Sequence, residues 1–153
     1  IDGQIWRGGN LCAAEIGHLT LDPNGPKCYC GQRGCMDLYC AATVLDSQYE
    51  DNLESFFTHL KNKEEKAVSL WETYLDHLAR AINTVRLLFD CPIILGGYVG
   101  AYMNDYTDDL RRRVAELDSF RNSPLEVRCC KYRKEAIAAG AALHFITEYI
   151  DSI

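Results

Sequence analysis

The sequence predicts an α/β fold, on two observations. The run Cys91-Pro92-Ile93-Ile94-Leu95 is apolar and ends at Gly96-Gly97, which is typical of a buried parallel strand that turns sharply into a helix. From about residue 63 onward, the patterns follow the order helix, strand, helix, strand, helix. Parallel strands need a crossover between them, so this order predicts an α/β sandwich with parallel pairing.

Length and composition predict one folded domain. The chain has 153 residues, 48% hydrophobic and 25% charged, which excludes a disordered tail, collagen or a low-complexity scaffold. It contains no internal repeat and no linker. We therefore predict a single domain over 1–153 with three parts: a cysteine-rich loop at about 15–37, a helical segment at about 36–90 and a strand-helix-strand-helix segment at about 92–151.

Net charge limits the partners expected for this chain, and hydropathy limits its expected location. A formal charge of -6 repels the phosphate backbone of DNA, so this chain is not expected to bind DNA itself. No apolar run reaches the roughly 18 residues of a membrane helix, and the first residues lack a signal-peptide pattern, so a soluble, cytoplasmic protein is expected. The opening Ile1-Asp2-Gly3-Gln4 is typical of a hairpin turn entering a strand, which indicates a fragment.

The amino-terminal half begins with irregular structure and continues with helices. Residues 1–35 are rich in glycine and poor in helical period, which predicts strands and a shaped loop. A short helix is expected at 36–46. A second helix is expected at 53–60, with Asp51 or Asn52 as its cap.

The longest helical pattern covers about 63–89. Apolar residues recur there at alternating spacings of four and three, at Trp71, Leu75, Leu78, Ile82, Val85 and Phe89. This spacing places them on one helix face. The face either packs on its own domain, which is the commoner case, or also serves in self-association.

The last third predicts two further helices and a strand. A helix is expected at about 99–117, and the alternation of Leu125-Glu126-Val127-Arg128-Cys129 predicts a strand with one exposed face. The final helix runs from about 134 to 150. It carries small residues that would let it lie close to a sheet, namely Ala136, Ala139, Gly140 and Ala141.

A possible metal site lies in the cysteine-rich loop. Cys28, Cys30 and Cys35 fall within eight residues, and His18 lies just before them. One imidazole and three thiolates are the donors of a closed tetrahedral site, which predicts structural Zn²⁺ and no catalytic metal chemistry. Two alternatives remain at this point: unrelated reduced cysteines with a surface histidine, or a disulfide between two of the cysteines.

The same residues carry a resemblance to a known family. Glu15-Ile16-Gly17-His18, followed by the run from Asp22 to Cys35 with its Cys-x-Cys-Gly-x-x-Gly-Cys spacing, resembles the signature of the ROK family (repressor, open reading frame, kinase). The similarity extends through Gly8, Asn10, Ala13, Ile94-Leu95-Gly96-Gly97 and Gly140-Ala141-Ala142. It covers essentially the whole chain and implies the carboxyl-terminal lobe of a ribonuclease H-like fold of the actin and hexokinase type.

The resemblance also implies roles for individual residues. His18, Cys28, Cys30 and Cys35 match the family's zinc ligands. Three residues match the positions that bind the sugar, namely Glu15, His18 and Asp37, and Gly96 and Gly97 match a loop that approaches the nucleotide. The implied partner is a sugar or amino sugar, with or without a phosphate, and the intact protein is expected to form a homo-oligomer.

Three positions depart from the family pattern. Asp37 stands where most members have glutamate, so its carboxylate is set back by one methylene and the sugar identity is in doubt. Ala14 replaces a glycine, which matters only if that position needs a positive φ. Tyr98 follows Gly96-Gly97 where kinases of the family tend to have a small residue, and its ring either obstructs a nucleotide or points elsewhere.

The family contains both repressors and sugar kinases, and the fold does not decide between them. The run Cys35-Met36-Asp37-Leu38-Tyr39-Cys40 resembles the repressors more than the kinases. Our prediction is the sugar-sensing, zinc-containing domain of a transcriptional repressor, with DNA contacted only through a missing amino-terminal region. The alternative is the corresponding lobe of an ATP-dependent sugar kinase, and a third is a zinc-stabilised interaction domain. As an isolated fragment, the chain is not expected to be catalytic.

Overall fold

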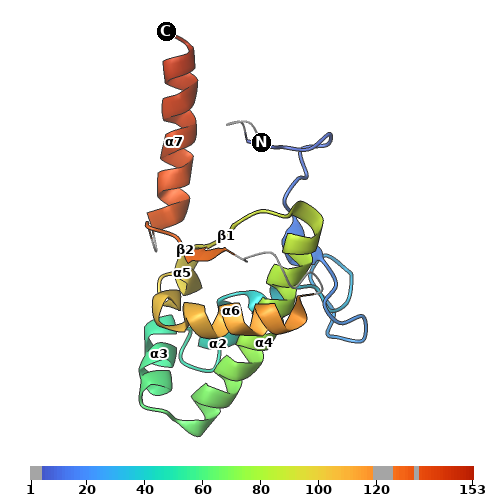
Figure 1. The fold of residues 1–153 in the computed structure, drawn as a ribbon, viewed down its shortest axis with the longest axis vertical. Coiled ribbons are helices and arrows are strands. Elements are labelled where there is room, and N and C mark those ends of the chain that lie inside the picture. Colours follow the sequence, from blue (N-terminus) through green and yellow to red (C-terminus); the bar gives the residue numbers. More distant parts are fainter. Residues whose placement is uncertain (1–4, 119–125, 133–134) are drawn as a thin grey trace.

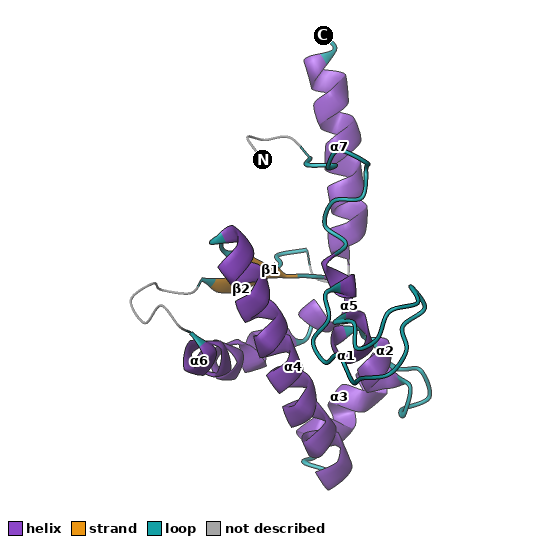
Figure 2. Cartoon of the chain, turned by 90° about the vertical axis from the view of Figure 1, so that its right-hand side faces the viewer, coloured by secondary structure: helices purple, strands orange, loops and turns teal. Residues whose placement is uncertain are grey.

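The computed structural model describes residues 5–118, 126–132 and 135–153 (Figures 1 and 2). Its elements, in order along the chain, are η1 (Ile16–His18), α1 (Asp37–Cys40), α2 (Thr43–Asp46), α3 (Leu53–Lys61), α4 (Glu65–Phe89), β1 (Ile93–Leu95), α5 (Gly97–Gly100), η2 (Met103–Tyr106), α6 (Thr107–Leu117), β2 (Val127–Cys129) and α7 (Ala136–Asp151). None of the described helices is long and apolar enough to cross a membrane.

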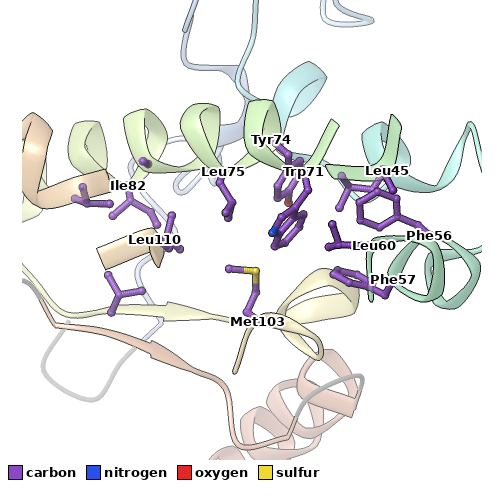
Figure 3. Close-up of a cluster of buried hydrophobic side chains, with 14 of the residues drawn as sticks. Leu45, Phe56, Phe57, Leu60, Trp71, Tyr74, Leu75, Ile82, Met103 and Leu110 are labelled. Atoms are coloured by element: carbon purple, nitrogen blue, oxygen red, sulfur yellow. The ribbon is translucent and has the colours of Figure 1, made fainter. Parts of the chain in front are cut away.

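Helix α4 is the central helix of the hydrophobic core. Its predicted apolar face is buried at Trp71, Leu75 and Ile82, which are at most 4% exposed. Leu78 and Val85 are half-buried, and Phe89 is 62% exposed, so the prediction is wrong for the last turn of the helix. Figure 3 shows the buried side chains packed against α3, η2 and α6. The buried cluster includes Leu45, Phe56, Phe57, Leu60, Trp71, Tyr74, Leu75, Ile82, Met103 and Leu110. Each fully buried large apolar side chain contributes about 1.5–3 kcal/mol, so this cluster is the main stabilising feature of the described part.

Helix α3 begins at the predicted cap. The side chain of Asn52 accepts hydrogen bonds from the backbone N–H groups of Glu54 and Ser55, at 2.9 and 3.2 Å. These bonds satisfy two of the amide donors that the first turn of a helix leaves open. The cap therefore directs Phe56 and Phe57 into the core beside Trp71.

The described sheet is smaller than predicted. Strands β1 and β2 pair in parallel, with Ile93 opposite Val127 and Leu95 opposite Cys129, which confirms the parallel pairing. No other strand is described, so the described residues are mainly helices and loops, and the α/β sandwich is present only in this reduced form. Leu125, expected in the second strand, lies outside the described residues.

The strands expected in residues 1–35 are absent from the described part, 5–35. Only two isolated bridges form there, Thr20 with Cys35 and Lys27 with Arg33. The backbone hydrogen bonds of this segment close tight turns instead of a ladder: Gly34 N–H donates to Pro26, and Cys28 N–H donates to Gln32. The glycine-rich composition therefore indicated a shaped loop and not strands.

Two predicted helices are interrupted. The helix expected at 36–46 divides into α1 and α2 because Ala41 is extended, with φ -70° and ψ 157°. The helix expected at 99–117 divides into α5, η2 and α6. Gly100 lies directly on the preceding strand, since a Cβ built there would lie 2.9 Å from the carbonyl oxygen of Leu95. Tertiary packing therefore bends the chain where the sequence pattern alone is continuous.

Helix α7 does not lie against a described sheet. It starts beside β2 and projects away from the other helices (Figure 1). None of its described side chains is buried, including the small residues expected to approach a sheet. The expectation of close sheet packing is therefore wrong for the described part of the chain, and Lys134, where the helix was expected to begin, lies outside it.

Candidate metal centre and its neighbours

The four predicted ligands come together in the cysteine-rich loop. One ligand atom each from His18, Cys28, Cys30 and Cys35 lies within 4.8 Å of the others. Cys28 and Cys35 are buried, His18 is half-buried and Cys30 is exposed. Such proximity is not expected of unrelated loop cysteines with a surface histidine, so the structure disfavours that alternative.

Local backbone geometry brings the cysteines around the site. Gly31 and Gly34 have φ of +93° and +62°, in the left-handed region that glycine adopts without strain. A Cβ built on Gly34 would lie 1.6 Å from the carbonyl oxygen of Asp22, so no other residue fits there. The glycine allows the loop to close and places Cys35 opposite Cys28.

The cysteines of the loop form no disulfide. All eight cysteines are free, and the Sγ atoms of Cys30 and Cys35 are 3.6 Å apart, well beyond a disulfide bond. Burial raises the pKa of the Cys35 thiol to about 12, whereas a hydrogen bond to the backbone of Gln32 lowers the pKa of Cys30. A metal ion favours the thiolate form, so the donor set fits Zn²⁺ in kind and number.

His18 separates the thiols from an acidic side chain. Its Nδ1 lies 3.9 Å from Cys28 Sγ, and its Nε2 lies 4.0 Å from an oxygen of Glu15. The short helix η1 sets this orientation, because it contains His18 and begins directly after Glu15. The imidazole therefore faces the thiol of Cys28 with one nitrogen and the carboxylate of Glu15 with the other.

Asp37 lies next to the segment that contains Glu15 and His18. It begins helix α1 two residues after Cys35, and a Cβ built on Gly17 would lie 3.7 Å from its Oδ1. Gly17 stands between Glu15 and His18, so the loop brings together the three residues expected to bind sugar. Ala14 has a φ of +67°, which confirms that the position before Glu15 requires a left-handed backbone.

Tyr29 also belongs to this site and was not predicted. Its ring packs edge-on against His18, with centroids 5.1 Å apart, while 80% of the residue remains exposed. Burial together with the negative charges of Asp37, Cys28, Glu15 and Cys30 raises the pKa of its hydroxyl. A single aromatic residue between two cysteines has no periodic pattern, so sequence reasoning had no signal for it beyond its place in the loop.

The predicted nucleotide loop lies beside the segment that follows Asp37. Gly97 has a φ of +70° and begins α5. Gly96 and Tyr98 line a cavity of about 320 Å³ together with Cys40 and Ala42. A larger cavity of about 540 Å³, between α3 and η2, contains none of the predicted site residues, so size alone does not identify the site here.

The family model for "ROK family" matches residues 1–148. The N-acetylmannosamine kinase of Citrobacter koseri is 30% identical over 148 residues, and that of Escherichia coli strain SMS-3-5 is 33% identical over 147. These alignments cover 93% and 92% of this chain, which spans about half the length of each relative. The crystal structure of a ROK hexokinase from Thermus thermophilus matches with a TM-score of 0.77 and 25% identity, over 97% of this chain and 52% of that one.

These similarities correct one prediction. We expected a repressor's sensor domain, because Tyr98 follows Gly96-Gly97 where its ring could obstruct a nucleotide, and because the run from Cys35 to Cys40 resembled repressors. The relatives are instead named as kinases, and the structural match is a hexokinase. The prediction of a repressor is therefore wrong, because a short run of residues around a structural loop carries too little information to separate the two branches.

Proposed function

Because the chain belongs to the ROK family, we propose that it forms the sugar-binding lobe of an ATP-dependent kinase that acts on an amino sugar of the N-acetylmannosamine class. The orientation of His18 carries the proposal: one nitrogen faces the thiols and the other faces Glu15. Relatives with 30% and 33% identity that are named N-acetylmannosamine kinases support the substrate class.

Glu15, His18 and Asp37 are proposed to hold the sugar. A carboxylate accepts hydrogen bonds from neighbouring sugar hydroxyls, and two carboxylates on either side of Gly17 would fix the ring from two directions. The imidazole Nε2 of His18 adds a further polar contact. The carboxylate of aspartate at position 37 reaches less far toward the sugar than that of glutamate would. This residue would therefore help to select the sugar.

Zn²⁺ is proposed to bind His18, Cys28, Cys30 and Cys35 and to have a structural role. With four protein ligands the ion would have no open coordination position, so it would hold the loop in shape and would not activate a water molecule. Ligand atoms within 4.8 Å of one another support this set. The loop would then keep Glu15 and His18 at a fixed angle to the sugar.

The Gly96–Gly97 loop is proposed to approach the nucleotide. Phosphoryl transfer requires a carboxylate that takes the hydroxyl proton, a cradle for the phosphates and a metal that spreads the charge. By resemblance, the base and the first phosphate loop lie in the other half of a ROK kinase. The chain by itself would therefore bind sugar without transferring the phosphoryl group.

The test is ATP turnover by a protein in which these 153 residues are joined to the other half of the Escherichia coli N-acetylmannosamine kinase. We expect ADP release with N-acetylmannosamine, and a loss of about tenfold or more in kcat/KM for Glu15→Gln. The 153-residue chain alone should release no ADP. No turnover by the folded joined protein with N-acetylmannosamine, N-acetylglucosamine or glucose would contradict the proposal.

A further inference from the structure

Tyr29 lies at the corner of a tight turn in the cysteine-rich loop. The N–H of Gly31 donates to the carbonyl of Cys28 at 3.0 Å, which closes a turn with Tyr29 and Cys30 at its corners. The N–H of Cys28 in turn donates to the carbonyl of Gln32 at 2.8 Å. The backbone of Tyr29 is therefore held in place between two of the candidate metal ligands.

The side chain of Tyr29 packs against the imidazole of His18. The two ring centroids are 5.1 Å apart, and the ring planes meet at 73°. Aromatic pairs favour this edge-to-face arrangement. The imidazole nitrogens are directed at other groups, with Nδ1 3.9 Å from Cys28 Sγ and Nε2 4.0 Å from an oxygen of Glu15. The ring of Tyr29 therefore restricts the rotation of His18 without competing for either nitrogen.

The ring of Tyr29 also lies near the carboxylates of the candidate sugar site. Partial burial, followed by the negative charges of Asp37, Cys28, Glu15 and Cys30, raises the pKa of its hydroxyl. Charges act on a group at the protein surface in this way only at short range. Since 80% of the residue is exposed, Tyr29 presents an aromatic surface to solvent beside this site.

Such a surface supplies a kind of contact that the other residues of the site do not. Glu15, His18 and Asp37 are proposed to bind the sugar through polar atoms. An N-acetylated sugar also carries a methyl group, which neither donates nor accepts a hydrogen bond and gains free energy when it leaves water. Binding sites for small molecules therefore combine a few polar groups with an apolar, often aromatic, wall.

We propose that Tyr29 is a specificity-determining residue for the sugar. The contact with His18 holds the ring in place, and its exposed face contacts the methyl of the acetamido group of an N-acetylated sugar. This inference rests on the proposed function, because it concerns the same sugar site. It adds a division of labour: Glu15, His18 and Asp37 bind hydroxyls that hexoses share, whereas Tyr29 distinguishes an acetamido group from a hydroxyl.

The experiment measures the dissociation constants of N-acetylmannosamine and mannose by calorimetry, for this chain and for the joined protein. Mannose has a hydroxyl in place of the acetamido group, so the ratio of the two constants separates this contact from a general change in the loop. We expect Tyr29→Ala to lower the preference for N-acetylmannosamine about fourfold or more, which corresponds to roughly one buried methyl group.

Two further variants complete the comparison. Tyr29→Phe should keep the preference within about twofold, because the ring is retained. Tyr132→Ala is the matched control and should keep it as well, since Tyr132 is 52% exposed and lies outside the loop. In the joined protein, Tyr29→Ala should raise KM for N-acetylmannosamine and change kcat little, because the methyl contact is the same in the ground state and the transition state.

Other outcomes overturn the proposal. If Tyr29→Ala weakens the binding of both sugars equally, the residue only supports the loop. If Tyr29→Phe loses as much preference as Tyr29→Ala, the contact belongs to the hydroxyl and not to the ring. In both cases, turnover of N-acetylmannosamine by the joined protein would leave the proposed function standing. Binding with the expected ratios but without turnover would support the role of Tyr29 and contradict the proposed function, and binding of neither sugar would overturn both.

Discussion

Ala14 adopts a backbone conformation that its side chain disfavours. Its φ of +67° lies in the left-handed region, which costs a residue with a Cβ about 1–2 kcal/mol. Glu15 follows directly, so the strained peptide helps to set the direction of a carboxylate in the candidate sugar site. The family resemblance places a glycine at this position, and the structure gives the physical reason.

Replacing Ala14 with glycine should therefore stabilise the protein. The relief of strain exceeds the extra entropy that glycine loses on folding, which leaves a gain of up to about 1 kcal/mol and a rise of about 2–4 °C in melting temperature. The measurement is thermal unfolding followed by circular dichroism. Ala13→Gly is the control, because Ala13 has no positive φ, and an equal gain there would contradict this explanation.

Cys35 is the most enclosed of the candidate zinc ligands, with 0% exposure. Cys35→Ser should lower the zinc content from about one ion per chain to a small fraction, because a serine hydroxyl is a poor ligand for Zn²⁺. Metal analysis by mass spectrometry measures this. Cys91→Ser is the matched control, since Cys91 is free, exposed and outside the cluster. Equal zinc in both variants would remove Cys35 from the ligand set.

At the scale of elements, ion pairs join α6 to α4. Arg113 of α6 pairs with Asp76 of α4 at 2.5 Å and with Glu72 of the same helix. Asp109 accepts from Arg112 and Arg113 within α6. Burial raises the pKa of Asp109, but the hydrogen bonds and charges of the two arginines outweigh it, so the pKa lies below the ordinary 3.8.

This shift predicts a specific pH dependence. A carboxyl group with a lowered pKa in the folded state stabilises the fold above its unfolded pKa, and this contribution is lost as pH falls through the folded pKa. Asp109→Asn should therefore cost about 0.5–1 kcal/mol at pH 7, and this cost should shrink as pH falls below the ordinary carboxyl pKa. Urea unfolding between pH 2.5 and 7, values chosen about the ordinary carboxyl pKa, measures this. Asp108→Asn is the control, because the Asp108 side chain is 96% exposed.

At the scale of the whole molecule, the cysteine-rich loop and the helical core have different sources of stability. The core depends on buried apolar side chains from α3, α4, η2 and α6, whereas the loop between Glu15 and Asp37 contains the short helix η1, turns and two isolated bridges. Helix α1, which follows the loop, is tied to α4: the hydroxyl of Tyr74 donates to the carbonyl of Cys40 at 2.8 Å.

Removal of metal by a chelator should therefore affect one part more than the other. We expect faster hydrogen exchange in residues 16–36, by at least about tenfold, while residues 71–82 of α4 keep their protection. Hydrogen exchange with mass spectrometry, before and after treatment with a chelator, measures both regions in one sample. Unchanged exchange in the loop, with zinc shown to be removed, would contradict a structural role of the ion.

Sequence patterns identified the elements that depend on local chemistry. The cap at Asn52 and the apolar face of α4 follow from spacing and residue type. The cap is present, and the face is buried from Trp71 to Ile82 but not at Phe89. The cluster of candidate metal ligands could also be predicted from the sequence, because thiolates and an imidazole at short spacing have few other functions. The separation of α5 from α6 could not be predicted from the sequence, since it depends on the contact of Gly100 with β1.

The sequence by itself determined the family, the four candidate ligands and the positions of most helices, because each depends on residue types at short spacing. Only the tertiary structure decided three features: that Asp37 lies beside Gly17, that Ala14 adopts a left-handed backbone, and that α7 projects away from the other helices. The physical reason is that these depend on contacts between distant segments, whose distances no local pattern encodes.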